Sequence, residues 1–181
     1  AQTEVRCRRL ASALRRRGIG EGDTVSIVAP NVPAMFEAHF GVPMSGAVLN
    51  TINTRLDADA MAFIFQHAQS KVVLVDREFG AVVRKALSLI DSQSLVIAID
   101  DPTYLEGELV GELTYEAFVA TGDEQEPGWL PADEWQAISL NYTSGTTGNP
   151  KGVVYHHRGA HLNAINNVLS WELPKHPVYL W

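Results

Sequence analysis

Apolar and polar positions in the first hundred residues alternate between two patterns. Four apolar runs have the length and continuity of buried strands: residues 23–29, 47–52, 71–76 and 95–99. Three segments between them carry apolar residues three and four positions apart, as helices do: residues 33–41, 57–69 and 79–90. Continuously apolar strands that alternate with helices predict an α/β fold, a layered and mainly parallel sheet with helices on both faces.

An amphipathic helix opens the chain. Cys7, Leu10, Ala11 and Leu14 recur at helical spacing and form one apolar face. On this face Cys7 is expected to be a small core residue rather than a nucleophile. Gly18 is expected to end the helix. The solvated faces are expected to carry six arginines: Arg6, Arg8, Arg9, Arg15, Arg16 and Arg17.

A proline-rich turn, Pro30-Asn31-Val32-Pro33, precedes the next helix. Asn31 is a suitable N-cap, because its side chain can accept a hydrogen bond from a free backbone amide. Pro33 suits the first helical turn, where its missing N–H costs nothing. We expect this helix to end at Gly41.

The periodic pattern weakens between residues 100 and 134, where glycine and proline are scattered among acidic residues. We predict a connecting segment across the surface, with one short helix at residues 115–120. Its aromatic and aliphatic residues are expected to be partly buried: Tyr104, Leu105, Phe118 and Trp129. The Asp100-Asp101 pair at its start is expected to form a solvated turn.

Two short strands are predicted at residues 137–140 and 153–155, with a helix through Leu162, Ile165 and Leu169 after them. The last residues, 171–181, tend toward another strand. The chain thus divides into an α/β part at residues 1–100, a connecting segment at 101–134 and a final part at 135–181.

A glycine- and hydroxyl-rich stretch, Y-T-S-G-T-T-G-N-P-K-G, joins these two strands at residues 142–152. Glycine lets backbone amides approach an anion, hydroxyl groups bind phosphate oxygens or Mg²⁺, and lysine adds charge. A Walker A loop is excluded, because Lys151 lies between Pro150 and Gly152 and a strand-like run follows instead of a helix. From composition alone, a plain hairpin loop is the alternative.

The stretch resembles the signature phosphate loop of the AMP-forming adenylating enzymes, and residues 46–56 and 151–159 are similar to the acyl-CoA synthetase branch of that superfamily. The resemblance implies that Lys151 and Thr146 are catalytic and that Thr146 also binds Mg²⁺. It further implies that ATP phosphates are bound by Thr143, Ser144, Gly145, Thr146, Thr147, Gly148 and Lys151.

By the same resemblance, the chain is part of the large N-terminal lobe of an AMP-forming acid-thiol ligase. Such an enzyme activates a short- or medium-chain fatty acid, or a related acid, as an acyl-adenylate and transfers it to coenzyme A. The family's adenine, ribose and acyl sites are expected beyond residue 181, so this chain alone is expected to be inactive. Two alternatives are a non-catalytic nucleotide-binding or interaction module and an adenylating enzyme outside the CoA-ligase branch.

Composition narrows the expected partners to the carboxylic acid, ATP and coenzyme A. A net charge of -7 disfavours nucleic acid as a partner. The single cysteine excludes an intrachain disulfide framework, and no apolar run has transmembrane length, so a cytoplasmic protein is expected. His156, His157 and His161 lack the neighbouring glutamate and the further ligand of a zinc motif. A homo-oligomer is left open.

Overall fold

A seven-stranded sheet organises the computed structural model, which describes residues 2–143 and 149–178. Its strand order is β5-β4-β3-β1-β2-β6-β7, and every neighbouring pair is parallel except β6 and β7. The strands are β1 (Thr24–Val28), β2 (Val48–Thr51), β3 (Ser70–Asp76), β4 (Leu95–Ile99), β5 (Leu113–Thr114), β6 (Ala137–Thr143) and β7 (Lys151–His156). The prediction of a mainly parallel α/β sheet is therefore confirmed.

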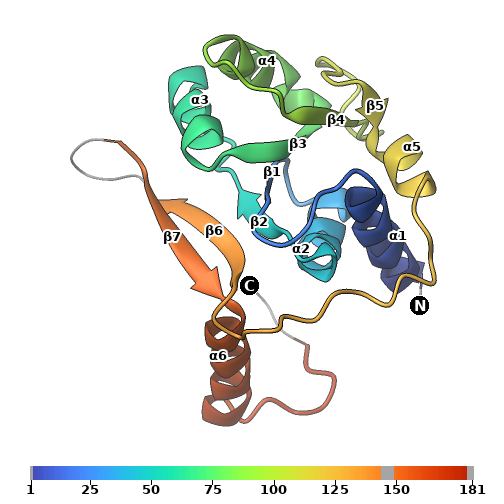
Figure 1. Ribbon diagram of the computed structural model, residues 1–181, viewed down its shortest axis with the longest axis vertical. Helices are drawn as coiled ribbons and strands as arrows, with labels where there is room; N and C mark the ends of the chain where they lie inside the picture. The colour runs from blue at the N-terminus through green and yellow to red at the C-terminus, as the bar shows by residue number, and fades with distance from the viewer. Residues whose placement is uncertain (1, 144–148, 179–181) are drawn as a thin grey trace.

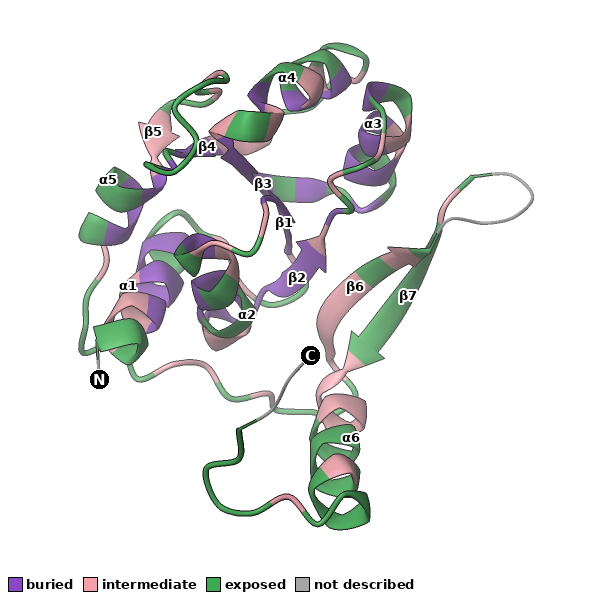
Figure 2. Ribbon diagram, turned by 180° about the vertical axis from the view of Figure 1, so that it is seen from behind, coloured by how far each residue is buried: buried purple, intermediate pink, exposed green. Residues whose placement is uncertain are grey.

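Helices cover both faces of this sheet (Figure 1). Alternate residues of β3 belong to two separate apolar cores: Val72 and Leu74 to one, Val73 and Val75 to the other. Helices α1 (Gln2–Arg16), α2 (Pro33–Ser45) and α5 (Tyr115–Ala120) contribute to the first core. Helices α3 (Ala58–His67) and α4 (Gly80–Ser88), which the 3₁₀ turn η1 (Arg77–Phe79) precedes, contribute to the second. Figure 2 shows the buried residues along these inner faces.

The second helix departs from its predicted ends. Its N-cap is Val32 with no capping side chain, so the prediction of Asn31 as the cap is wrong. The helix also continues past Gly41, because this glycine lies against Leu10 of α1 rather than at a helix end. It stops at Gly46, whose φ of 92° is the left-handed conformation that glycine adopts without strain.

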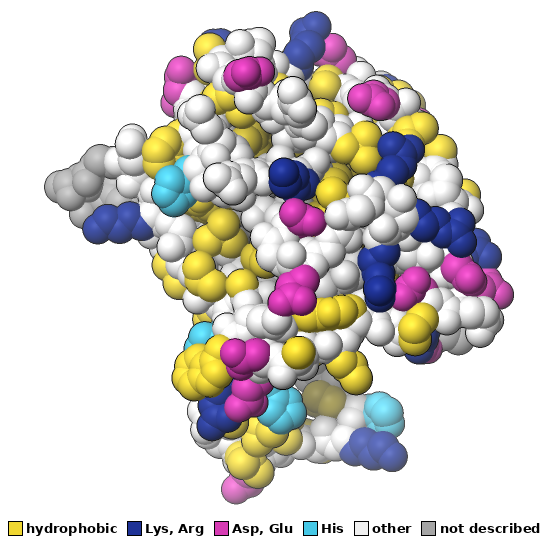
Figure 3. All heavy atoms as spheres, in the orientation of Figure 1, with side chains coloured by type: hydrophobic (Ala, Val, Ile, Leu, Met, Phe, Trp, Pro, Cys, Tyr) yellow, Lys and Arg dark blue, Asp and Glu magenta, His cyan; other side chains and the backbone are white. Residues whose placement is uncertain are grey.

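Several of the arginines on the solvated faces of α1 also hold the connecting segment. Arg9 pairs with Glu124 at 2.7 Å and Arg15 pairs with Glu126 at 3.1 Å. Arg8 also donates to the Glu126 carbonyl at 2.7 Å. Acidic and basic side chains are interleaved on the right of Figure 3, where α1 and the connecting segment lie in the same view of Figure 1. The acidic composition of the segment therefore matches the arginines of α1, which lie more than a hundred residues away in the chain.

Burial along the connecting segment follows the prediction only in part. Phe118 on α5 is fully buried in the first core, as expected. Leu105 is 78% exposed and Tyr104 is 37% exposed, so they are not the buried groups predicted for this segment.

The β6–β7 hairpin and the helix that follows it, α6 (His157–Ser170), extend from the α/β layers (Figure 1). Strand β6 joins the sheet through a single residue pair, Leu49 with Ser139. The apolar side chains of this part are largely exposed: Val153, Val154, Tyr155, Leu162, Ile165, Val168 and Leu169. Residues 171–178 form turns and bends, so the strand expected after this helix is absent from the described part of residues 171–181.

Candidate phosphate-binding site

The hairpin brings the two ends of the glycine-rich stretch together. In its antiparallel register Thr143 lies opposite Lys151, and Tyr142 lies opposite Gly152. Residues directly opposite each other in such a pair project to the same face, so the Thr143 hydroxyl and the Lys151 ammonium share one face. Strand β7 follows at once, which confirms that the lysine does not open a helix as in a Walker A loop.

Of the residues predicted to bind ATP, two are described. Thr143 and Lys151 are both exposed. None of the ion pairs formed within residues 2–143 and 149–178 includes Lys151. An exposed cation beside a hydroxyl group is a donor set that suits phosphate oxygens. The other predicted residues lie outside the described residues: Ser144, Gly145, Thr146, Thr147 and Gly148.

A contact that the sequence did not indicate holds the hairpin at Tyr142. The Tyr142 hydroxyl lies 2.6 Å from Nδ1 of His67, the last residue of α3. The two rings meet edge-on, with centroids 5.8 Å apart and an interplanar angle of 81°. The ring of Tyr142 also packs against the second core, and burial raises the pKa of its hydroxyl. Because His67 precedes Tyr142 by 75 residues, no local pattern pairs them.

The adjacent histidines at the junction of β7 and α6 build the start of α6. Nδ1 of His156 accepts a hydrogen bond from the Gly159 amide at 2.9 Å and so caps the helix. Its ring centroid lies 4.7 Å from that of Trp135. The ring centroids of His157 and Trp129 lie 5.8 Å apart. Burial lowers the pKa of the His157 imidazole. Across the described residues, no group of three His, Cys, Asp or Glu side chains could hold a metal ion.

The two carboxylates after β4 are separated by their contacts. Asp100 pairs with Arg77 at 2.5 Å. Asp101 is only 8% exposed and accepts from the Thr103 hydroxyl at 2.8 Å, so the expected solvated turn is wrong for this residue. Its carboxylate replaces water with a local hydrogen bond, as turn aspartates commonly do.

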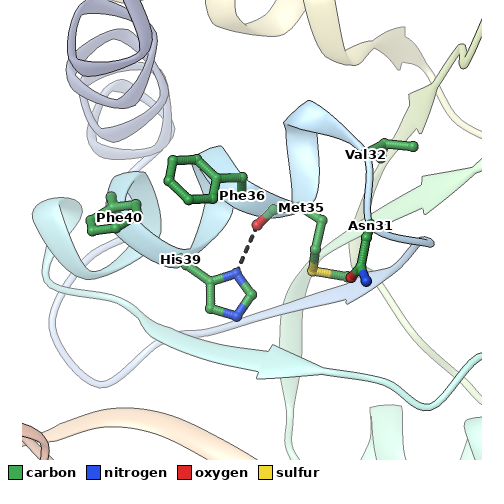
Figure 4. A pocket seen from close by; sticks show the side chains of 6 residues that line it. All are labelled: Asn31, Val32, Met35, Phe36, His39 and Phe40. Carbon is green, nitrogen blue, oxygen red and sulfur yellow. Dashed lines mark hydrogen bonds between the residues drawn. The ribbon is translucent and has the colours of Figure 1, made fainter. Parts of the chain in front are cut away.

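A hollow of about 400 Å³ opens on the outer side of α2 (Figure 4). It is lined by Asn31, Val32, Met35, Phe36, His39 and Phe40. Nδ1 of His39 lies 2.8 Å from the Met35 carbonyl, within the helix itself. The hollow is therefore mainly apolar, and neither Thr143 nor Lys151, the two described residues predicted to bind ATP, lines it.

No helix among residues 2–143 and 149–178 has the length and apolar content that crossing a bilayer requires.

Known proteins resemble this chain over nearly its whole length. It is 52% identical to the peroxisomal acetate/butyrate–CoA ligase AAE7 of Arabidopsis thaliana, over 99% of this chain and 34% of the relative. It is 48% identical to the peroxisomal trans-cinnamate:CoA ligase of Petunia hybrida, again over 99% and 34%. The chain thus spans about a third of the length of the curated relatives it matches.

The fold has a counterpart among solved structures. The anthranilate CoA ligase AuaEII, in complex with anthranoyl-AMP, superposes with a TM-score of 0.81 at 24% identity, over 91% of this chain and 30% of that one. The profile of the family described as AMP-binding enzyme matches residues 1–181. With its mainly parallel sheet and its glycine-rich hairpin, the chain belongs to the AMP-binding enzyme family.

Proposed function

We propose that this chain is part of an ATP-dependent acid–CoA ligase and supplies its phosphate-binding hairpin. The observation that carries the proposal is the pairing of Thr143 with Lys151 at the base of the glycine-rich stretch, with the lysine outside the ion pairs of the described residues. Relatives whose names specify CoA ligases favour this branch over an adenylating enzyme that does not use coenzyme A.

The proposed reaction has two steps. A carboxylate oxygen of the acid attacks the α-phosphorus of ATP, the bond to the bridging oxygen breaks, and acyl-adenylate and pyrophosphate form. The coenzyme A thiol then attacks the acyl carbon, loses its proton and displaces AMP. In the first step negative charge builds on the departing pyrophosphate, so a fixed cation and hydroxyl donors lower the barrier.

Lys151 is assigned to the phosphates as this cation, and the Thr143 hydroxyl as a donor beside it. Thr146 is proposed to supply a hydroxyl ligand to Mg²⁺, whose charge would offset that of the phosphates. Acetate and butyrate, named for the Arabidopsis relative, and cinnamate, named for the Petunia relative, are the first acids to test.

The test is acid-dependent exchange of pyrophosphate into ATP by the whole enzyme that contains this segment. Lys151→Ala and Thr146→Ala should each lower the rate of adenylate formation by about 100-fold, by analogy with the loss of one donor at other preorganised anion sites. Lys71→Ala, which removes an exposed lysine from β3, is the matched control and should leave the rate unchanged. A rate near that of the wild type in Lys151→Ala would contradict the assignment.

The same assay, together with measurements of nucleotide binding and of thioester formation, decides between the proposed function and the alternatives. A module that binds ATP without turnover would show nucleotide binding but no exchange with any acid. An adenylating enzyme outside the CoA branch would exchange pyrophosphate but form no thioester.

A cytoplasmic location remains our prediction from the sequence, although both plant relatives are named as peroxisomal. Imaging of the whole protein with an N-terminal fluorescent tag distinguishes the two compartments. A diffuse signal supports the prediction, and a punctate signal that overlaps a peroxisomal marker contradicts it.

A further inference from the structure

The end of α3 touches the base of the phosphate-binding hairpin. His67 Nδ1 and the Tyr142 hydroxyl lie 2.6 Å apart, and their rings meet edge-on. His67 also stacks on Phe63 one turn earlier, with centroids 5.3 Å apart and an interplanar angle of 17°. We propose that His67 is a positioning residue that fixes the hairpin through Tyr142 for the binding of ATP phosphates, an inference that rests on the proposed function.

Such a contact matters because the backbone pairing of the hairpin with the rest of the sheet is limited to one residue pair within the described residues. Its single pair with β2 is formed by Ser139, at the third of the seven residues of β6. The strand then continues to Thr143, four residues farther along. Because no backbone pair with β2 follows Ser139 in the described residues, small rotations of the outer part of the hairpin would displace Thr143 and Lys151. The His67 contact acts one residue before Thr143, where it can stop this motion.

The ring of Tyr142 also registers the second strand. Gly152 lies opposite Tyr142, and a Cβ atom at this glycine would meet Cζ of Tyr142 at 3.3 Å and Cδ1 of Leu140 at 3.0 Å. The absence of a side chain at Gly152 therefore lets the tyrosine ring lie close to β7. One ring thus contacts α3 on one side and the residue next to Lys151 on the other.

The chemistry of this contact is that of orientation. Both partners can donate and accept a hydrogen bond, and a hydroxyl group bonded to an imidazole is held in direction as well as in place. Stacking on Phe63 restricts the imidazole ring in turn. Such restraint lowers the entropy that the hairpin loses when it binds ATP. Removing the contact between His67 and Tyr142 should therefore weaken ATP binding more than it slows the chemical step.

The experiment measures pyrophosphate exchange by the whole enzyme, with His67→Ala and Tyr142→Phe. Each variant should raise the KM for ATP by about fivefold, the equivalent of one net hydrogen bond, and leave the KM for the acid unchanged. His39→Ala is the matched control, since His39 is also an exposed helical histidine with one hydrogen bond. His67→Asn, which keeps a hydrogen-bonding group near the position of Nδ1, should recover most of the affinity for ATP.

A second set of outcomes concerns the pair itself. The double variant His67→Ala/Tyr142→Phe should raise the KM for ATP no more than either single variant, because both remove the same bond. The inference is overturned if His67→Ala behaves like His39→Ala, if both Michaelis constants rise together, or if the two effects multiply.

Hydrogen exchange at the backbone separates this inference from the proposed function. In His67→Ala, exchange at the amides of Tyr142, Thr143 and Gly152 should become faster, with no change in His39→Ala. If the hydrogen-exchange rates of these amides do not change in His67→Ala, the inference is overturned even in an active enzyme. If the wild type shows no acid-dependent exchange of pyrophosphate into ATP, the proposed function is refuted. The hydrogen-exchange measurement would still test the contact between His67 and Tyr142.

Discussion

Individual polar residues in the two cores differ in how completely their hydrogen-bonding groups are satisfied. Glu37 of α2 is 3% exposed and accepts from Nε of Arg6 at 2.5 Å and from the Tyr115 hydroxyl at 2.9 Å. Both of its oxygens are therefore occupied. Asp76, at the end of β3, is fully buried, and one oxygen accepts from the Glu78 amide at 3.0 Å. Its other oxygen has no partner among the residues described, so a charge at this position is costly.

Asp76 gives a prediction about pH. Burial raises the pKa of its carboxyl above the ordinary aspartate value, with a further contribution from the charge of Asp101. The folded state therefore holds this proton to higher pH than the unfolded state does. The contribution to stability is complete below about pH 4 and is lost as the pH rises through the folded pKa.

Asp76→Asn should remove this loss, because the amide oxygen can still accept from the Glu78 N–H and no charge forms. Urea unfolding at several pH values between 4 and 7 measures the effect. The variant should gain stability relative to the wild type as the pH rises. A constant difference across this range would show that Asp76 does not titrate differently in the two states.

Between elements, helices α1 and α2 pack closely at Gly41. A Cβ atom there would lie 2.7 Å from Cδ2 of Leu10 and 3.0 Å from the Cys7 carbonyl. The leucine tip can move, whereas the backbone oxygen of the neighbouring helix cannot move alone. Gly41 therefore sets the distance between the two helices.

Gly41→Ala should destabilise the fold by about 1 kcal/mol. Overpacking costs about 1–3 kcal/mol, and the better helix propensity of alanine returns about 1 kcal/mol. Gly20→Ala is the control, because a Cβ atom there would meet its nearest neighbour, the Ser45 carbonyl, at an ordinary 3.6 Å. Urea unfolding of both variants measures the difference. Equal stability of Gly41→Ala and the wild type would mean that the helices separate without cost.

The elements that local patterns specify were predictable. Strand β4 and helix α5 have the predicted bounds, since each is a compact apolar pattern flanked by turn residues. Strand β5 was missed, because its two residues are too few for a period. The pairing of α1 arginines with the connecting segment and the contact of His67 with Tyr142 join residues far apart in the chain. Within the candidate site, sequence thus indicated Thr143 and Lys151 but not the residue that holds the hairpin.

For the molecule as a whole, the α/β layers and the hairpin with α6 differ in burial. The buried residues of the two cores lie in strands β1 to β4, in helices α1 to α5 and in the loops beside them. In α6 no residue is buried, and Leu169 is 71% exposed. An apolar surface of this kind on a domain commonly contacts further protein.

The whole-molecule prediction is that the purified 181-residue chain shows no acid-dependent pyrophosphate exchange. In the purified chain the phosphate hairpin is present, but its apolar surface and that of α6 face water instead of further protein. Assays with acetate, butyrate and cinnamate at high protein concentration test this. A folded state verified by circular dichroism is the control, and robust exchange would contradict the prediction.

The single pair between β2 and β6 also affects how the protein is made. Leu49 and Ser139 are 90 residues apart in the chain. Their contact therefore closes a long loop and forms late relative to local structure. The hairpin itself pairs residues that are close in the chain. During synthesis β2 therefore leaves the ribosome well before its partner and remains an open sheet edge, able to pair with another nascent chain.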